Sequence, residues 1–191
     1  MKVRICIVVI FLMCFASVGL AKQFTDNEYG YTITIPDAWN EVPIHNDDTL
    51  PEERYSCNYI DEEKKLLRSM QIGMAHSVTS KNVSTLYDLT DYEVDNFSKQ
   101  CSENMENKLF AKLKKQIPSI TWIGTKLYRG SNNIWVICNM KAYYKSGRAI
   151  QFVSAETIIK GDFMQLFICY MGDEENVETV FQQIMGSVKP L

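Results

Sequence analysis

The chain has 191 residues, of which 46% are hydrophobic and 23% are charged, and its formal net charge is −3. This is ordinary globular composition, with enough apolar residues for one domain and a core. Because the net charge shows no excess of basic residues, we expect no nucleic-acid partner.

The first 21 residues have the layout of a secretory signal peptide. Lys2 and Arg4 precede an apolar run over residues 5–18, and small residues then permit cleavage after Ala21. The alternative is a transmembrane anchor, but the run is shorter than the ~20 residues that a span needs. We therefore expect a secreted or periplasmic protein that meets the membrane only through this transient segment, with one domain over residues 22–191. Cleavage removes two basic residues and no acid, which changes the formal net charge from −3 to −5.

A first strand is expected at residues 31–35, where apolar side chains alternate with threonines. The polar residues 22–28 before it are expected to form a loose lead-in. Pro36 ends the strand because proline cannot donate to the ladder. Trp39 follows where the chain would fold back onto the sheet edge. Packing is the favoured role for this side chain, and a ligand platform is the alternative.

Residues 40–54 are expected to form an acidic, irregular loop, and residues 55–60 and 67–76 a hairpin. The chain has two histidines, His45 in the loop and His76 at the end of the hairpin. The spacing of His45 from Asp47 and Asp48 matches no metal site, and a lone histidine at a strand end, such as His76, is most often structural. We therefore expect a solvated role for His45, a structural role for His76 and no metal.

A long helix follows the hairpin. Residues 90–93 form a capping box, S/T-x-x-E, and apolar residues then recur every three or four positions from Val94 to Ile117. Pro118 ends the helix. A run of about 26 residues is far longer than an average helix, so a break near residues 104–107 is an alternative.

Four strands are then expected in a row, at residues 119–129, 133–144, 148–160 and 162–170. Connections this short join antiparallel neighbours, so the block is a meander. The last strand is apolar at both its even and its odd positions, and it therefore needs cover on both faces of the sheet.

A second amphipathic helix is expected at the end of the chain. Acidic residues 173–175 stand at its start, and its apolar stripe ends at Val188. Two amphipathic helices and a sheet that is apolar on both sides are best combined with one helix on each face. The predicted fold class is therefore α+β, an antiparallel β-sheet with helices on both faces, or α/β/α sandwich.

Four cysteines follow the signal segment: Cys57, Cys101, Cys138 and Cys169. An even number in an exported chain permits up to two disulfides, and four buried free thiols are the alternative. A Cys138–Cys169 bridge is disfavoured, because a strand between them separates them by about 9–10 Å, beyond the ~7 Å limit for bridged Cα atoms. No CxxC pair is present, and we expect no cofactor.

The opening strand reads Tyr29-Gly-Tyr-Thr-Ile-Thr-Ile-Pro-Asp-Ala-Trp39, the meander contains Trp135, and the last helix ends in Phe-Gln-Gln-Ile-Met-Gly-Ser-Val-Lys. With the order of the elements, these features resemble the PsbP-like superfamily over about residues 24–190. The superfamily includes the extrinsic subunit of photosystem II, a Ran-binding nuclear import factor, and short secreted or lipid-anchored bacterial proteins. The resemblance implies an antiparallel sheet between helices and a role in binding other proteins, and it supplies no catalytic residue.

No catalytic constellation stands out in the sequence. There is no G-x-S-x-G elbow or phosphate-binding glycine loop, and a hydrolase, the alternative, would have to use one of the two histidines. We therefore expect no enzyme, but a binding or accessory protein whose partner is another envelope protein. A small-molecule or ion binder, with a pocket between the sheet and the long helix, is the second hypothesis.

The candidate binding surface is the hairpin tip between the second and third strands of the meander. It contains Tyr143, Tyr144, Lys145 and Arg148, and adjacent tyrosines beside cations are typical of interface anchors. Trp39 is added to this set as the candidate ligand platform. The alternative is that one tyrosine packs inward and the other covers the strand edge.

Overall fold

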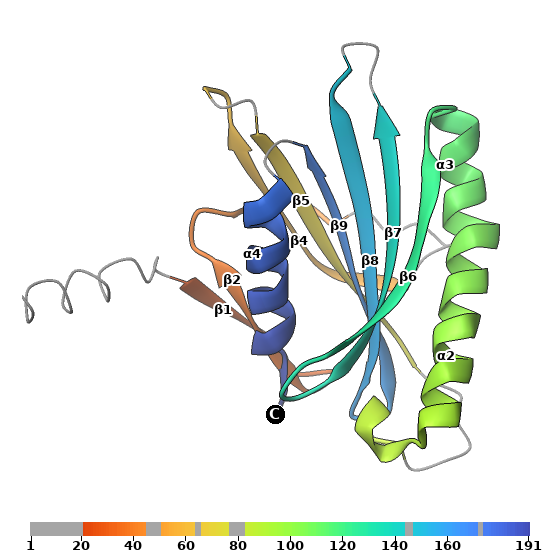
Figure 1. Ribbon diagram of the computed structural model, residues 1–191. Helices are drawn as coiled ribbons and strands as arrows, with labels where there is room; N and C mark the ends of the chain where they lie inside the picture. Colours follow the sequence, from red (N-terminus) through yellow and green to blue (C-terminus); the bar gives the residue numbers. More distant parts are fainter. Residues whose placement is uncertain (1–20, 45–50, 64–65, 77–82, 144–146, 172–173) are drawn as a thin grey trace, which may run out of the picture.

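The computed structural model describes residues 21–44, 51–63, 66–76, 83–143, 147–171 and 174–191. These residues form an α+β fold with a large antiparallel sheet, a small sheet and helices (Figure 1). Within this described part of the chain, the seven strands of the large sheet follow the order β3-β4-β5-β9-β8-β7-β6, and the small sheet follows β1-β2-β10. Predictions on His45, Tyr144, Lys145 and residues 1–20 lie outside the described residues.

The elements have the following bounds. The large sheet contains β3 (Asn40–Glu41), β4 (Glu52–Asp61), β5 (Leu66–Ala75), β6 (Thr121–Arg129), β7 (Ile134–Tyr143), β8 (Ala149–Ile159) and β9 (Asp162–Met171). The small sheet contains β1 (Ala21–Asp26), β2 (Tyr31–Pro36) and β10 (Lys189–Pro190). The helical segments are η1 (Leu86–Asp88), α2 (Asp91–Asn104), the π-helical η2 (Met105–Phe110), α3 (Ala111–Gln116) and α4 (Glu174–Ser187).

The predicted meander is confirmed. Strands β6 to β9 pair with their neighbours in sequence order, all antiparallel. The predicted hairpin is also present as β4 and β5, and it joins the meander because β5 pairs with β9. Met70, Ile72 and Met74 on β5 are fully buried on one face, as their alternation predicted.

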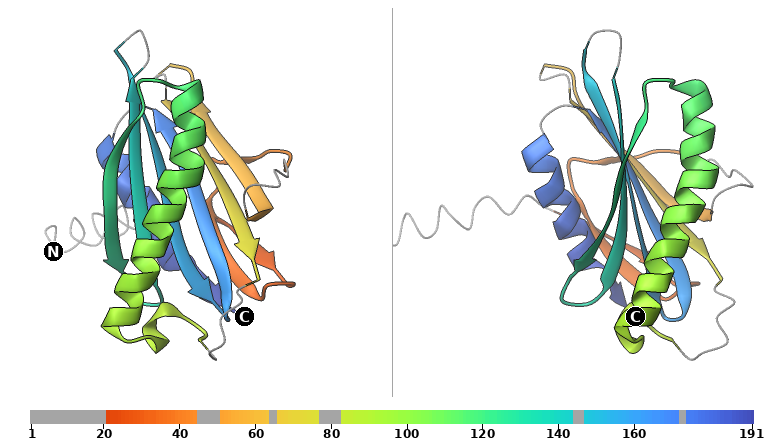
Figure 2. Two further views of the ribbon diagram at one scale, coloured as in Figure 1. Left: turned by 90° about the vertical axis from the view of Figure 1, so that its right-hand side faces the viewer. Right: turned by 45° about the vertical axis from the view of Figure 1, so that its right-hand side comes forward.

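The large sheet is covered on both faces. Figure 2 shows α4 on one side of the sheet and the continuous helix α2–η2–α3 on the other. The even positions of β9, such as Leu166 and Ile168, share a core cluster with Phe181 and Ile184 of α4. The odd positions, such as Phe167, pack into a second cluster beneath the long helix. The two lids therefore bury opposite faces of the same strands, as expected for side chains that alternate along a strand.

The layer that contains α4 also holds the small sheet, which the sandwich prediction did not include. Residues 22–28 were expected to be a loose lead-in, and this was wrong, because residues 21–26 form β1 and pair with β2. Phe24 anchors β1 by packing its ring 4.6 Å from that of Tyr55, centroid to centroid. On β2, Ile33 and Ile35 are fully buried in the same core cluster as α4.

The long helix begins at the predicted capping box. The Glu93 N–H donates to Thr90 Oγ1 over 3.3 Å, and the Thr90 N–H donates to Glu93 Oε2 over 3.0 Å. The break considered near residues 104–107 takes the form of the π-helix η2, so the helix widens there but continues. Its apolar stripe faces the sheet, with Val94, Cys101 and Met105 buried.

All four cysteines of the described chain are free thiols, which agrees with the second of the two alternatives left open by the sequence. Three of them are buried and Cys169 is partly buried. Among the described residues, no helix combines the length and the hydrophobicity that a membrane crossing requires.

Candidate functional site

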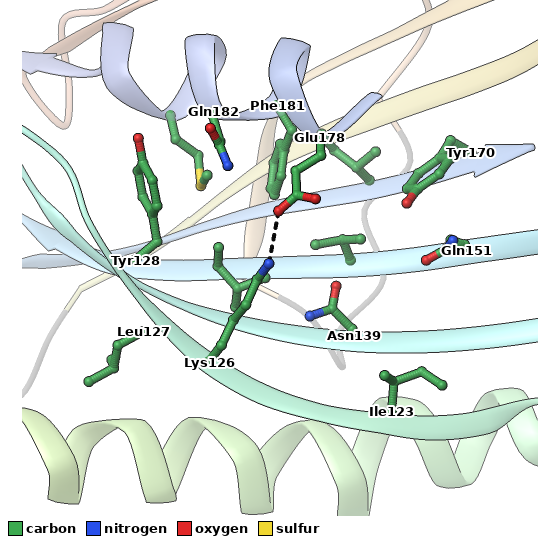
Figure 3. A pocket seen from close by; sticks show the side chains of 14 residues that line it. Ile123, Lys126, Leu127, Tyr128, Asn139, Gln151, Tyr170, Glu178, Phe181 and Gln182 are labelled. Carbon is green, nitrogen blue, oxygen red and sulfur yellow. Dashed lines mark hydrogen bonds and ion pairs between the residues drawn. The ribbon is translucent and has the colours of Figure 1, made fainter. Parts of the chain in front are cut away.

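A groove of about 320 Å³ lies between α4 and the strands β6–β9. It exists because α4 covers only part of its face of the sheet, and the part next to β6 stays open. In Figure 3, Phe181, Glu178 and Gln182 approach the groove from α4, and Lys126 approaches from β6. Three side chains from the strands, Ile137, Val153 and Ile168, form the apolar part of its floor.

The strand register produces a gradient of polarity along this floor. Asn139, Val153 and Ile168 lie side by side on β7, β8 and β9. Two residues further along the strands, Gln151 lies between Lys141 and Tyr170. Because alternate residues share a face, the groove runs from an apolar region beneath α4 to a polar row near the hairpin tip.

An ion pair links the two sides of the groove. Lys126 Nζ on β6 lies 2.9 Å from Glu178 Oε1 on α4, and Figure 3 shows this contact between α4 and β6. Both side chains are more than half exposed. An exposed pair of this kind contributes only about 0.2–1 kcal/mol to stability, so it can be broken by an incoming ligand at little cost.

The polar groups that line the groove are suited to binding. Three are side-chain amides, those of Asn139, Gln151 and Gln182, which both donate and accept hydrogen bonds. Among the described lining residues there is no histidine, serine, threonine or cysteine that could act as a base or nucleophile of the usual hydrolase type. The arrangement can hold a ligand with apolar and hydrogen-bonding parts.

A second cavity, of about 300 Å³, lies between the long helix and the opposite face of the sheet. Glu156 from β8 and Gln165 from β9 line it, together with Cys101 and Met105 of the helix. Glu156 is only 3% exposed. Burial raises the pKa of its carboxyl group, although hydrogen bonds from Cys101, Ser154 and Gln165 act in the opposite direction.

The sequence matches no family model and no curated protein. Solved structures do match. The solution structure of cyanobacterial PsbP (CyanoP) from Synechocystis sp. PCC 6803 has a TM-score of 0.57 and 11% identity, over 92% of this chain and 96% of that chain. This chain has a PsbP-like fold.

Two further structures match the PsbP-like chain with lower scores. LpqN, involved in cell envelope biogenesis of Mycobacterium tuberculosis, has a TM-score of 0.45 and 10% identity, over 90% of this chain and 91% of that one. The Ran-binding protein Mog1p of Saccharomyces cerevisiae has a TM-score of 0.41 and 8% identity, over 90% and 95%. At 11% identity the likeness to CyanoP extends to the fold alone, and that fold agrees with the resemblance drawn from the opening strand and the order of elements.

The sequence-predicted tip of the PsbP-like domain is only partly described. Tyr143 is 52% exposed at the end of β7, with Lys141 Nζ 5.6 Å from its ring centroid, and Arg148 is exposed at the start of β8. Tyr143 shares its strand face with Lys141 and Asn139, so its side chain lies on the same face of β7 as the polar end of the groove.

Trp39 does not lie on either of these surfaces. Its side chain is 3% exposed in the core cluster that contains α4, and its carbonyl accepts a hydrogen bond from Lys22 Nζ over 2.7 Å. The structure therefore places Trp39 in the packing role that the sequence favoured, and it leaves no face of the indole open for a ligand.

Sequence reasoning missed both the groove and Glu156. The groove depends on how far α4 extends over the sheet, which no local pattern encodes. The sequence does contain a signal for Glu156. Ser154 and Glu156 put polar groups at alternate positions of β8, a strand that is otherwise almost entirely buried. A pair of polar residues on one face of such a strand indicates a buried polar cluster that needs hydrogen-bond partners.

Proposed function

We propose that this PsbP-like chain is a non-enzymatic binding protein of the cell envelope or the secreted space. We propose further that it holds an extended segment of a partner protein in the groove between α4 and β6–β9. The observation that carries the proposal is the pairing of an apolar floor with three side-chain amides, Asn139, Gln151 and Gln182, in one open groove.

The chemistry of the groove suits a polypeptide segment. Peptide bonds present one donor and one acceptor per residue, and side-chain amides satisfy both. The apolar floor of Ile137, Val153 and Ile168 offers burial to alternate side chains of such a segment. A Lys126–Glu178 pair that stabilises the protein only weakly would exchange partners when the segment enters.

The position of β6 supports an extended partner. In the described chain β6 is the last strand of the large sheet, so its outer edge pairs with no further strand there. Ile123 lies at the bulge of this strand, is 61% exposed and lines the groove. An apolar side chain exposed beside an open strand edge is a common feature of surfaces that bind a strand from another protein.

The hairpin tip extends the same surface. Lys141, Tyr143 and the exposed Arg148 would contact the partner beyond the polar end of the groove, together with Tyr144 and Lys145. The location outside the cytoplasm rests on the signal-peptide layout of residues 1–21.

Site-specific photo-crosslinking tests this function in cells that produce the protein naturally. A photoreactive amino acid replaces Ile123 at the groove, or Ile60 on β4 as the control, since both isoleucines are similarly exposed, at 61% and 57%. We expect a discrete crosslink to one protein at position 123 and none at position 60. In a second variant, Asn139→Trp fills the groove and should abolish the crosslink.

Two results would contradict the proposal. Equal crosslinking at both positions would indicate chance collisions, and a crosslink at position 123 that survives Asn139→Trp would place the contact outside the groove.

A further inference from the structure

The cavity beneath the long helix contains a buried acid. Glu156 projects from β8 into the space that Phe97, Leu109 and Phe163 also line, on the face of the sheet opposite to the groove. The cavity lies where the helix changes from α2 to the π-helical η2, and Met105, the first residue of η2, lines it. Such π-helical turns widen a helix locally and are frequent at functional sites.

Among the described residues, the side chains that hydrogen-bond the Glu156 carboxyl group all donate to it. Oε1 accepts from Ser154 Oγ over 3.0 Å and from Gln165 Nε2 over 3.1 Å. The Cys101 thiol bonds to the same carboxyl group. Neutral donors on three different elements therefore surround the side chain in the way that suits a carboxylate.

The described residues supply no cation for this carboxylate. None of their ion pairs includes Glu156, and Lys108, which lines the cavity, is exposed on the helix. An unpaired buried carboxylate is disfavoured, because burial removes its hydration and hydrogen bonds from neutral groups replace only part of the lost stabilisation. The cavity thus places a carboxyl group among three hydrogen-bond donors, and the described residues supply no positive charge beside it.

The other titratable groups that face Glu156 do not provide that charge. Burial raises the pKa of the Cys101 thiol, and it raises the pKa of Cys138, on the neighbouring strand β7, to about 12. Both thiols are therefore neutral at physiological pH. Lys108 also lines the cavity, but its side chain is exposed to solvent.

We propose that this cavity binds a small organic ammonium ion with an apolar body. The ammonium group pairs with Glu156, and the apolar body packs against Phe97 and Phe163, whose ring centroids are 6.4 Å apart. Aromatic rings attract cations through their faces, so a cation held over either ring would gain a further favourable contact. A volume of about 300 Å³ places the cavity among sites for small ligands.

Binding of the ammonium ion is linked to a proton on Glu156. When the carboxyl group is protonated in the free protein, the incoming cation stabilises the carboxylate, and the proton leaves to the solvent. The affinity for the cation should therefore increase with pH until Glu156 is ionised in the free protein, whereas the affinity for a neutral molecule of the same shape should not.

Calorimetric titration with benzylammonium chloride tests the proposal, with benzyl alcohol as the neutral control. We expect the wild-type protein to bind benzylammonium at least tenfold more tightly than benzyl alcohol at neutral pH. Glu156→Gln should remove this preference, and Glu178→Gln, which neutralises the acid of the groove on the other face, should retain it. Repeating the titration in buffers of different ionisation enthalpy should reveal proton release.

The proposal is overturned if benzylammonium does not bind, if benzyl alcohol binds equally well, or if Glu156→Gln keeps the preference. If that variant does not fold, the wild-type protein still decides the question. Its preference for benzylammonium must then decrease as the pH is lowered, and a preference that is independent of pH overturns the proposal. The outcome is separate from that of the groove, because crosslinking at Ile123 does not involve this cavity.

Discussion

The two faces of the large sheet carry different chemistry under similar lids. The face beneath α4 has a buried apolar core at one end. At the other end it has an open groove with amides and an exposed ion pair. The face beneath α2–η2–α3 contains the buried acid Glu156, and many of the apolar side chains that its helix contributes are only partly buried. The contrast teaches that two helices on opposite faces of one sheet can cover different chemistry, since amides and an exposed ion pair lie beside α4 and a buried acid lies beneath the long helix.

The largest expected change in stability concerns the buried apolar core beneath α4. Leu166 is fully buried there, so Leu166→Ala should destabilise the protein by about 2–5 kcal/mol through lost burial and a residual cavity. Denaturant unfolding measures this change. Ile60→Ala, at a site that is 57% exposed, is the control and should change the free energy of unfolding by less than about 0.5 kcal/mol. Similar effects at the two positions would show that this face is not a packed core.

The cover on both faces of the large sheet could be predicted from the sequence. The alternation along β9 indicated that both faces of the sheet are covered, and the stripes around Val94 and Phe181 supplied the two lids. The small sheet could not be predicted, because β10 pairs with β2 through residues as far apart as Thr32 and Lys189. Local patterns report which side of an element is buried, and they do not report which distant segment covers it.

A smaller effect is expected for Glu156 on the other face. Its pKa is raised in the folded state, so this state binds more protons than the unfolded state, in which the carboxyl group has an ordinary pKa near 4.5. The wild-type protein should therefore lose stability relative to Glu156→Gln as the pH rises above about 4.5, and the loss should stop once Glu156 is ionised in the folded state. Each unit of pKa difference corresponds to about 1.4 kcal/mol.

Thermal unfolding of the two proteins between pH 4 and pH 8 measures this difference. Parallel curves would mean that Glu156 has an ordinary pKa in the folded protein and that its surroundings already stabilise the charge.

The smallest effect is expected at the ion pair across the groove. Lys126→Ala should destabilise the protein by no more than about 1 kcal/mol, and high salt should reduce the difference from the wild-type protein, because both charges are exposed. Denaturant unfolding at low and high ionic strength checks both expectations. A loss of several kcal/mol would show that the pair holds α4 in place, and the groove would then not open readily.

The central claim is that the two faces of the large sheet are separate binding surfaces. Two methionines report on them, Met105 in the cavity beneath the long helix and Met185 in the groove beside α4. With ¹³C-labelled methionine methyl groups, a titration with benzylammonium should shift the NMR signal of Met105 and leave that of Met185 unchanged. A shift at Met185, or at neither methyl group, would contradict the assignment of a cation site to the buried face.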